Sequence, residues 1–260
     1  MTRTEHSSLA RLALALIVSA GMAGAAAPRS THAGDGSPGG DIAALEGAVA
    51  QLKARLVRIE DADQIETLIS VYGYYLDKQQ WDQLTGLFAD DGTMEISLRG
   101  IYVGHASIRR ALELFGPQNI EPAHLHDHIQ LQPVIQISAD GTHAFSRSRA
   151  LSALGTYQRL GVWGDGVYEN EYVKQNGVWK IARDHIYTSF FSDYDHGWQS
   201  GARPAPKVSD KIPPDRPPSE LYESFPSVFV PPFHYTHPVT GAPIEIPQAL
   251  RVKPNTGAER

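Results

Sequence analysis

The chain has 260 residues, of which 42% are hydrophobic, and it carries a formal net charge of −6. This length allows one or two domains, and the hydrophobic content allows a substantial core. The net negative charge argues against a nucleic-acid partner. The sequence contains no cysteine, so the fold must be stable without disulfide bonds.

Residues 1–33 have the pattern of a signal peptide and its cleavage region. Arg3 and Arg11 precede an apolar run over residues 12–18, and Ala- and Gly-rich sequence follows it. The run is far shorter than the ~20 residues that a membrane span needs. Cleavage after Ala27 and cleavage after Ala33 are alternatives. We therefore expect an exported, periplasmic protein whose mature form has no membrane segment.

Residues 34–60 combine a Gly-rich linker with an amphipathic helix. Six apolar residues follow strict a and d spacing over nearly three heptads, namely Ile42, Leu45, Val49, Leu52, Leu56 and Ile59. The pattern fits a helix that lies on its own domain or a short coiled coil that joins subunits, and the spacing favours the coiled coil. Three heptads are marginal alone, so the coil would assist an oligomer that the globular domain already forms.

The next helical pattern is the one around which the rest of the chain is organised. Its apolar residues recur at steps of three and four, namely Ile65, Leu68, Ile69, Tyr72 and Leu76. Asp63, with Glu66 three residues later, predicts its start. Tyr72 and Asp77 lie roughly 140° apart around the axis and about 7.5 Å apart along it, so both can border one cavity.

The middle of the chain predicts a sheet covered by helices. Asp140-Gly141 and Asn176-Gly177 are typical of hairpin turns. Asp90-Asp91-Gly92 predicts the turn into the first strand. We expect helices over residues 81–88 and 106–115 and strands over residues 93–98, 124–137, 143–154, 167–175 and 178–190.

Residues 192–260 form a Pro-rich tail. Thirteen of the 18 prolines lie after residue 200. Large apolar residues are nevertheless spread through it, among them Leu221, Tyr222, Phe225, Phe229, Phe233 and Tyr235. Such a segment is expected to lie extended on a surface, which can be that of its own domain, of a neighbouring subunit or of a pocket mouth.

Three histidines alternate at the start of the third expected strand. His124, His126 and His128 would share one face, with neighbours roughly 6.5 Å apart. Such a set can hold a metal if Asp184 or His185 adds a ligand, but we favour a pocket acid or base at His128 and no metal. His124 and His126 are expected at the rim or at an interface.

The motifs over about residues 60–190 resemble the SnoaL-like branch of the NTF2-like superfamily. They are Tyr72-x4-Asp77, Leu-Phe-Ala-Asp-Asp-Gly at 87–92, Gly100-x3-Gly104-x3-Ile108, His128-x4-Pro133-x-Ile135, Gly166-x-Tyr168 and Gly177-x-Trp179-x-Ile181. The resemblance implies an α+β cone over residues 61–191, in which one curved antiparallel sheet wraps around helices and encloses a deep pocket.

The same motifs resemble two families of cofactor-free dehydratases with this fold, the scytalone dehydratases and the bacterial bile-acid dehydratases. This resemblance implies Tyr72, Asp77 and His128 as the catalytic residues. The sequence departs from the pattern at the second acid, because the strand over residues 144–152 carries Arg147 and Arg149 and no carboxylate. The candidate substrate-binding residues are Tyr75, Arg149, Tyr168, Asn170 and His185. His185 can point inward because it follows Trp179 and Ile181 on one strand face, although a structural histidine is the favoured interpretation.

We therefore expect a cofactor-independent lyase that acts on a small hydroxylated aromatic compound. Export and the tail also resemble, more faintly, bacterial lyases of lignin-derived diaryl dimers, which release formaldehyde. The dehydratases imply a homo-oligomer, most simply a trimer. The alternative is a non-catalytic binding or scaffold domain, because this fold serves both purposes.

Overall fold

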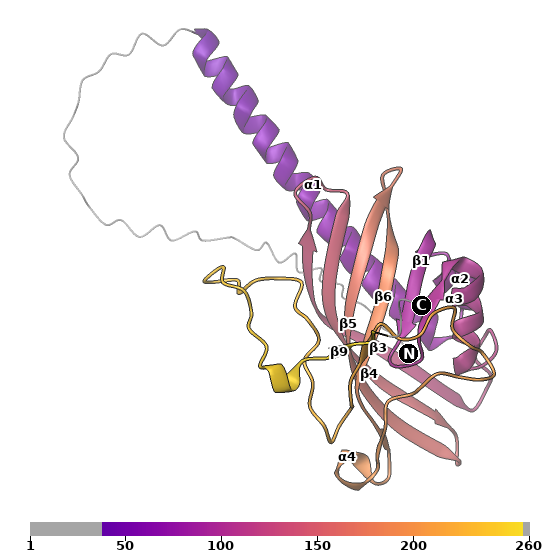
Figure 1. Ribbon diagram of the computed structural model, residues 1–260. Helices are drawn as coiled ribbons and strands as arrows, with labels where there is room; N and C mark the ends of the chain where they lie inside the picture. The colour runs from indigo at the N-terminus through magenta and orange to yellow at the C-terminus, as the bar shows by residue number, and fades with distance from the viewer. Residues whose placement is uncertain (1–37, 257–260) are drawn as a thin grey trace, which may run out of the picture. The chain divides into compact units, whose positions relative to one another are not determined.

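The computed structural model describes residues 38–256 (Figure 1). The expected signal peptide lies outside these residues. The chain divides into two compact units, residues 1–46 and 47–260, and of the first only the beginning of helix α1 is described. Within the described part, no helix is both long and apolar enough to cross a membrane.

Helix α1 is continuous over Pro38–Asp77, so the expected helix start at Asp63 is wrong. From Asp61 onward one face of the helix is buried. The buried carboxylate of Asp61 is held by Lys174 Nζ at 2.6 Å and Trp179 Nε1 at 2.8 Å. Its Oδ1 binds side chains of the sheet and does not cap a new helix. In the second unit, the heptad residues before this point are exposed: Val49, Leu52, Leu56 and Ile59.

One seven-stranded sheet forms the body of the second unit. Its order is β2-β1-β6-β5-β4-β3, with β7 paired to β6, and only the β1–β6 pair is parallel. Figure 1 shows the four long strands β3 to β6 side by side. The strands are β1 Phe88–Ile96, β2 Ile101–Val103, β3 His124–Ile137, β4 His143–Thr156, β5 Leu160–Gln175, β6 Val178–Asp193 and β7 Ala202–Arg203.

The helices after α1 are shorter than expected. They are α2 Trp81–Thr85, α3 Gly104–Leu112 and the 3-10 turn η1 Glu113–Phe115. The expected helix to Phe88 and turn at residues 90–92 are wrong, because β1 already begins at Phe88. Gly92 permits this path: a Cβ there would meet Ala89 O at 2.9 Å and Ile181 O at 3.0 Å. The strand therefore bends against β6 instead of turning back.

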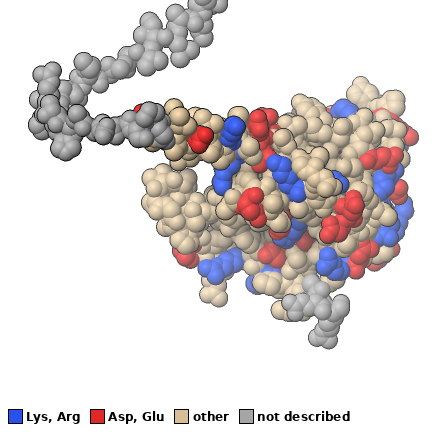
Figure 2. Space-filling model, turned by 90° about the horizontal axis from the view of Figure 1, so that it is seen from above, with Lys and Arg blue, Asp and Glu red and all other residues tan. Residues whose placement is uncertain are grey.

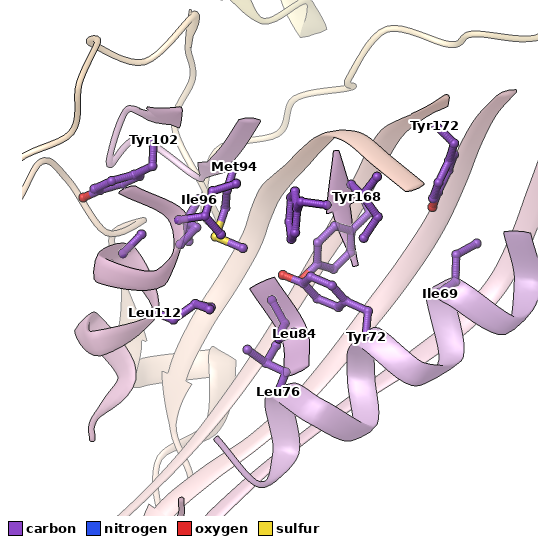
Figure 3. Close-up of a cluster of buried hydrophobic side chains, with 14 of the residues drawn as sticks. Ile69, Tyr72, Leu76, Leu84, Met94, Ile96, Tyr102, Leu112, Tyr168 and Tyr172 are labelled. Carbon is purple, nitrogen blue, oxygen red and sulfur yellow. The ribbon is translucent and has the colours of Figure 1, made fainter. Parts of the chain in front are cut away.

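The core lies between α1, the sheet and α3. Figure 3 shows Ile69, Tyr72 and Leu76 of α1 pointing toward side chains of the sheet. Serines and an alanine of β4 face this inner side and are buried, namely Ser146, Ser148, Ala150 and Ser152. The expected α+β fold, a curved antiparallel sheet with an N-terminal helix, is confirmed. On the face seen in Figure 2, acidic and basic side chains are interspersed.

Strand β6 contains an irregularity that decides which side chains face the core. Tyr172 of β5 pairs with Ile181, whereas the preceding residue Glu171 pairs with Arg183, so Ala182 is an extra residue. Such a bulge shifts the alternation of the strand by one residue. As a result Asp184 faces inward, and the expectation that His185 points inward is wrong.

The tail covers the outer side of β1 and β6. Glu95 and His185, neighbours on that side, are 2% and 1% exposed. The Glu95 carboxylate accepts hydrogen bonds from Ser219 N and Ser219 Oγ, both at 2.7 Å. Tyr187 stacks on His185 with ring centroids 4.0 Å apart and bonds to Glu220. The regular elements of the tail are α4 Gly197–Ser200, β8 Glu220–Leu221, η2 Gln248–Leu250 and β9 Lys253–Pro254.

Candidate active site

His128 projects from β3 into the interior and is hydrogen-bonded at both ring nitrogens. Its Nδ1 lies 2.9 Å from Ser152 Oγ on β4, and its Nε2 lies 2.9 Å from Tyr168 Oη on β5. Burial, with a smaller contribution from the neighbouring His126, lowers the pKa of His128 to about 3. The imidazole is therefore neutral near pH 7 and is held in one orientation by two strands.

Asp77, which the resemblance implies as catalytic, contacts the backbone of His128 and not its ring. Its Oδ1 accepts a hydrogen bond from the backbone N–H of His128 at 2.5 Å, while the ring is engaged by Ser152 and Tyr168. Burial raises the pKa of Asp77, and the bond from His128 opposes that rise. Asp77 borders a small cavity of about 200 Å³ together with Tyr74. The structure thus brings Asp77 to the strand that carries His128 and not to the imidazole.

Asp184 is the carboxylate that meets Tyr72. Tyr72 Oη donates to Asp184 Oδ2 at 3.1 Å, and Asn170 Nδ2 donates to Oδ1 at 3.0 Å. The amide oxygen of Asn170 in turn accepts the backbone N–H of His185 at 3.0 Å, which fixes the amide orientation. Asp184 is 0% exposed, and this burial raises its pKa to about 7 despite the two hydrogen bonds.

Two tyrosines join the His128 and Asp184 ends of this group. The rings of Tyr72 and Tyr168 meet edge to face with centroids 5.8 Å apart, and Figure 3 shows them side by side. Their hydroxyls interact, and burial raises both pKa values well above the ordinary value. Both phenols therefore remain protonated and can donate hydrogen bonds. We call the set the inner network: Ser152, His128, Tyr168, Tyr72, Asp184 and Asn170.

The structure separates the other candidates from the inner network. Tyr75 is partly buried and packs against the hydrophobic core. Arg149 lies on the outer face of β4, where its Nη1 contacts both carboxylate oxygens of Asp165 at 2.7 and 3.0 Å. Its neighbours Ser148 and Ala150 face inward, so alternation places the arginine outside. Arg149 cannot offer its charge to the inner network in this arrangement.

The sequence identified four members of the inner network as candidate site residues: Tyr72, His128, Tyr168 and Asn170. It missed the roles of Asp184 and Ser152. Asp184 had been considered only as a metal ligand, because the alternation from Trp179 placed its neighbour inward. Only the bulge at Ala182 reverses that choice. Ser152 lies opposite His128 in the β3–β4 register, so a correct strand pairing would have found it.

The histidines of β3 do not form a metal site. His126 packs against Phe115, with ring centroids 5.8 Å apart, and His128 is held by Ser152 and Tyr168, while His124 is exposed. His126 is 5% exposed, so its expected place at the rim is wrong. Among residues 38–256, no three His, Asp or Glu side chains converge on a point that could hold a metal ion.

A cavity of about 810 Å³ lies at the ends of β3, β4 and β5, and part of its wall, including Trp163, belongs to the outer face of the sheet. Leu154, which lines it, is two residues from Ser152 on the same strand face. Three aromatic side chains contribute to its wall, namely Tyr157, Trp163 and Tyr194, and the last two stack with centroids 6.1 Å apart. The volume falls within the range of about 300–1,000 Å³ that is usual for small-molecule sites.

The sequence of residues 57–185 matches the model of the SnoaL-like domain. This part of the chain belongs to the SnoaL-like family. The match covers the C-terminal part of α1 and the sheet as far as His185, and so contains the whole inner network. The predicted membership in this branch of the NTF2-like superfamily is confirmed. Among curated proteins, no sequence matches the chain significantly.

Several solved structures resemble the SnoaL-like domain. A putative scytalone dehydratase from Novosphingobium aromaticivorans is 22% identical over 59% of this chain and 96% of its own, with a TM-score of 0.48. A type 2 hexachlorocyclohexane dehydrochlorinase is 20% identical over 54% and 92%, with a TM-score of 0.47. An NTF2-like protein from N. aromaticivorans is 18% identical over 54% and 88%, with a TM-score of 0.43. A distant likeness of fold does not assign a reaction.

Proposed function

We propose that the SnoaL-like domain is a cofactor-independent lyase that acts on a hydroxylated aromatic compound. The observation that carries the proposal is the buried Asp184, which has a pKa of about 7 and shares a hydrogen bond with Tyr72. A carboxyl group that gains and loses a proton near neutral pH inside a protein, joined through two tyrosines to a histidine, is typical of acid–base catalysis.

In this proposal His128 is the base. Its imidazole is neutral near pH 7 because burial lowers its pKa, so the ring nitrogen that carries no proton can take one when the hydroxyl bonded to it turns away. Burial also makes the free ring a weak base. A substrate that becomes negatively charged beside the ring would raise the pKa of His128 and so favour proton transfer at that moment. Ser152 and Tyr168 hold the ring in place for this step.

Asp184 and Tyr72 supply the acid. When Asp184 is protonated, its O–H can donate to Tyr72 Oη, which leaves the tyrosine hydroxyl free to donate to a substrate oxygen. Tyr72 then gives its proton to the leaving oxygen and receives one from Asp184. The phenol itself stays protonated at rest because its pKa is raised by burial. The substrate oxygen must therefore come within hydrogen-bonding distance of Tyr72.

The same two steps serve two eliminations. In dehydration, His128 takes a proton from carbon, a C=C bond forms and the neighbouring hydroxyl leaves as water with the proton from Tyr72. In a diaryl compound with a hydroxymethyl group, His128 takes the hydroxymethyl O–H proton instead. The C–C bond then breaks to release formaldehyde, and its electron pair forms the C=C bond while the benzylic hydroxyl leaves as water. A lignin-derived diaryl dimer can carry both groups that the second elimination needs, the hydroxymethyl group and the benzylic hydroxyl.

The cavity of about 810 Å³ supports an aromatic substrate. Tyr157, Trp163 and Tyr194 offer ring faces on which an aromatic group can pack. Leu154, another residue of the wall, lies on the inner face one step from Ser152, roughly 6.5 Å away, whereas Trp163 lies on the outer face with Asp165.

The test is incubation of the purified protein with a panel of diaryl lignin dimers and hydroxysteroids, followed by absorbance of the new conjugated product and by assay of formaldehyde. Asp184→Asn should abolish most of the activity. Asp165→Asn is the matched control, because it alters a carboxylate of the same sheet on the outer face, bound to Arg149. Saturable binding of these compounds without turnover would favour the rival function, a binding domain.

A further inference from the structure

A continuous chain of hydrogen bonds runs through the inner network. Its members are, in order, Asp184, Tyr72, Tyr168, His128 and Ser152. Each of the two phenols has one proton and can therefore donate one hydrogen bond. The direction of one bond thus fixes the direction of the next, and the protons of the whole chain have two consistent arrangements.

When Asp184 is charged, every bond points toward it. A carboxylate can only accept, so Tyr72 must donate its proton to Oδ2. The oxygen of Tyr72 then accepts from Tyr168, whose own oxygen must accept from Nε2–H of His128. The ring is neutral because its pKa is about 3, so Nδ1 carries no proton and accepts from Ser152 Oγ. In this arrangement Nε2 holds the proton of the ring.

When Asp184 is protonated, every bond reverses. Asn170 Nδ2 donates to Oδ1 of Asp184, so the added proton belongs on Oδ2, the oxygen that faces Tyr72. Tyr72 accepts this proton in a hydrogen bond and donates to Tyr168, which donates to Nε2 of His128. The proton of the ring is then on Nδ1. This arrangement holds one proton more than the other, taken from solvent, and the other members only shift their protons.

Tyr168 is the residue through which the two ends communicate. It is buried, and its oxygen also accepts a hydrogen bond from the amide of Gln130. The amide oxygen of Gln130 accepts from Ser148 Oγ at 3.2 Å, so its NH₂ group is the part that faces Tyr168. With that donor fixed, the hydroxyl proton of Tyr168 points either to Tyr72 or to His128.

We infer that Tyr168 is a positioning residue that couples the charge of Asp184 to the tautomer of His128, so that a proton on Asp184 also frees Nε2 to act as the base. The inference rests on the proposed function for the roles of acid and base. In the charged arrangement Nε2 carries a proton and cannot take another. One proton on Asp184 thus prepares the acid at Tyr72 and the base at His128 together.

The other titratable groups that face the chain do not select a ring nitrogen. They are Tyr172, near Asp184, and His126 and Asp77, near His128. Tyr172 stays protonated because burial raises its pKa, and His126 stays neutral at pH 7 because burial lowers its pKa to about 4. Asp77 contacts the backbone N–H of His128 and not its ring.

The experiment follows both ends of the chain by NMR of the full protein without substrate. The two ¹⁵N resonances of the His128 ring report which nitrogen carries the proton, and the carboxyl ¹³C resonance reports the charge of Asp184. We expect the proton on Nε2 above, and on Nδ1 below, the pH of about 7 at which Asp184 titrates. Tyr168→Phe removes the hydroxyl and keeps the ring, and it should abolish this change of tautomer while Asp184 still titrates.

Tyr172→Phe is the matched control. Tyr172 is a buried tyrosine of the same strand, but its hydroxyl lies 2.9 Å from Ser146 Oγ, outside the chain. This variant should retain the change of tautomer. In the wild type, the ¹³Cζ resonance of Tyr168 should shift over the same pH range, which tests its role even if Tyr168→Phe does not fold. A single tautomer of His128 throughout the titration of Asp184, or a change that persists in Tyr168→Phe, would overturn the inference.

Failure of this inference and failure of the proposed function give different results. A tautomer of His128 that follows Asp184 through Tyr168, in a protein that turns over no compound of the panel, retains the coupling and rejects the lyase. Turnover that depends on Asp184, with one tautomer of His128 at every pH, retains the lyase and rejects the coupling.

Discussion

The hydroxyl of Tyr72 donates to the carboxylate of Asp184 across the interior of the sheet, at 3.1 Å, and so links the last turns of α1 to the middle of β6. The two residues are 112 positions apart in the chain. Because Asp184 is fully buried, this bond and the one from Asn170 are the contacts that stabilise its charged form. Each member of the pair therefore controls the protonation of the other.

Asp184→Asn should lower turnover by roughly 10²–10⁴-fold, the usual contribution of a positioned acid or base, and His128→Ala should do the same. Tyr72→Phe should cost less, because it removes a hydroxyl and keeps the ring that packs beside Tyr168. The double change of Asp184 and His128 should be little worse than the worse single change, since groups that act as a unit are not additive. Two losses that multiply would show that the residues act independently.

Asp77→Asn should have a small effect on turnover, because an amide oxygen can still accept the backbone N–H of His128. Asp77→Ala leaves that N–H without its partner and should lower the free energy of unfolding by about 1–3 kcal/mol. Thermal unfolding and steady-state kinetics of the two variants test this. If Asp77→Asn were as inactive as His128→Ala, Asp77 would act on the reaction through its charge.

Stability should fall as the pH rises from about 4 to above 7, because of Asp184. Its pKa is raised from 3.8 to about 7 in the folded protein, so in this window the folded state holds a proton that the unfolded state has lost. Over this whole pH range, the free energy of unfolding should fall by about 4 kcal/mol if this carboxyl acts alone. Denaturant unfolding of the wild type and Asp184→Asn across this range measures it, and equal pH dependence in both proteins would rule it out.

Ser219→Ala should loosen the tail over Glu95. The change removes the hydroxyl bond to a buried carboxylate and keeps the backbone bond. We expect faster proteolysis within the tail and a loss of about 1–3 kcal/mol. Ser227→Ala is the control, since its hydroxyl bonds to the exposed Glu223. Equal proteolysis of the two variants would indicate that the Ser219–Glu95 contact does not hold the tail.

We expect the mature protein to form a trimer in which the heptad face of α1 is covered by other copies. Leu52 and Leu56 are 62% and 54% exposed in the single chain. Replacing both with serine should weaken the oligomer without lowering the melting temperature of the sheet, because neither side chain is buried in the core. Analytical ultracentrifugation at micromolar concentration tests this, and a wild-type monomer would contradict it.

The sequence by itself determined the four long strands and the buried face of the helix that packs on them. The alternation and the β-forming residues over 124–137 predict β3 with its bounds. The 3.6-residue spacing of Ile65, Ile69, Tyr72 and Leu76 identified the buried face of α1, because periodicity reports burial. The family motifs placed Tyr72, His128, Tyr168 and Asn170 in one interior, where the structure also finds them.

Only the tertiary structure decided which acid serves that interior. The extra residue Ala182 in β6 reverses the alternation beyond it, and no local pattern marks a bulge that exists only in the pairing with β5. Asp184 therefore enters the core and His185 leaves it, while the tail buries the latter from the other side. Asp77 likewise meets the backbone of His128 because of where α1 crosses β3. Spacing along a chain fixes the direction of a side chain within its own element, but its partner depends on how two elements are packed together.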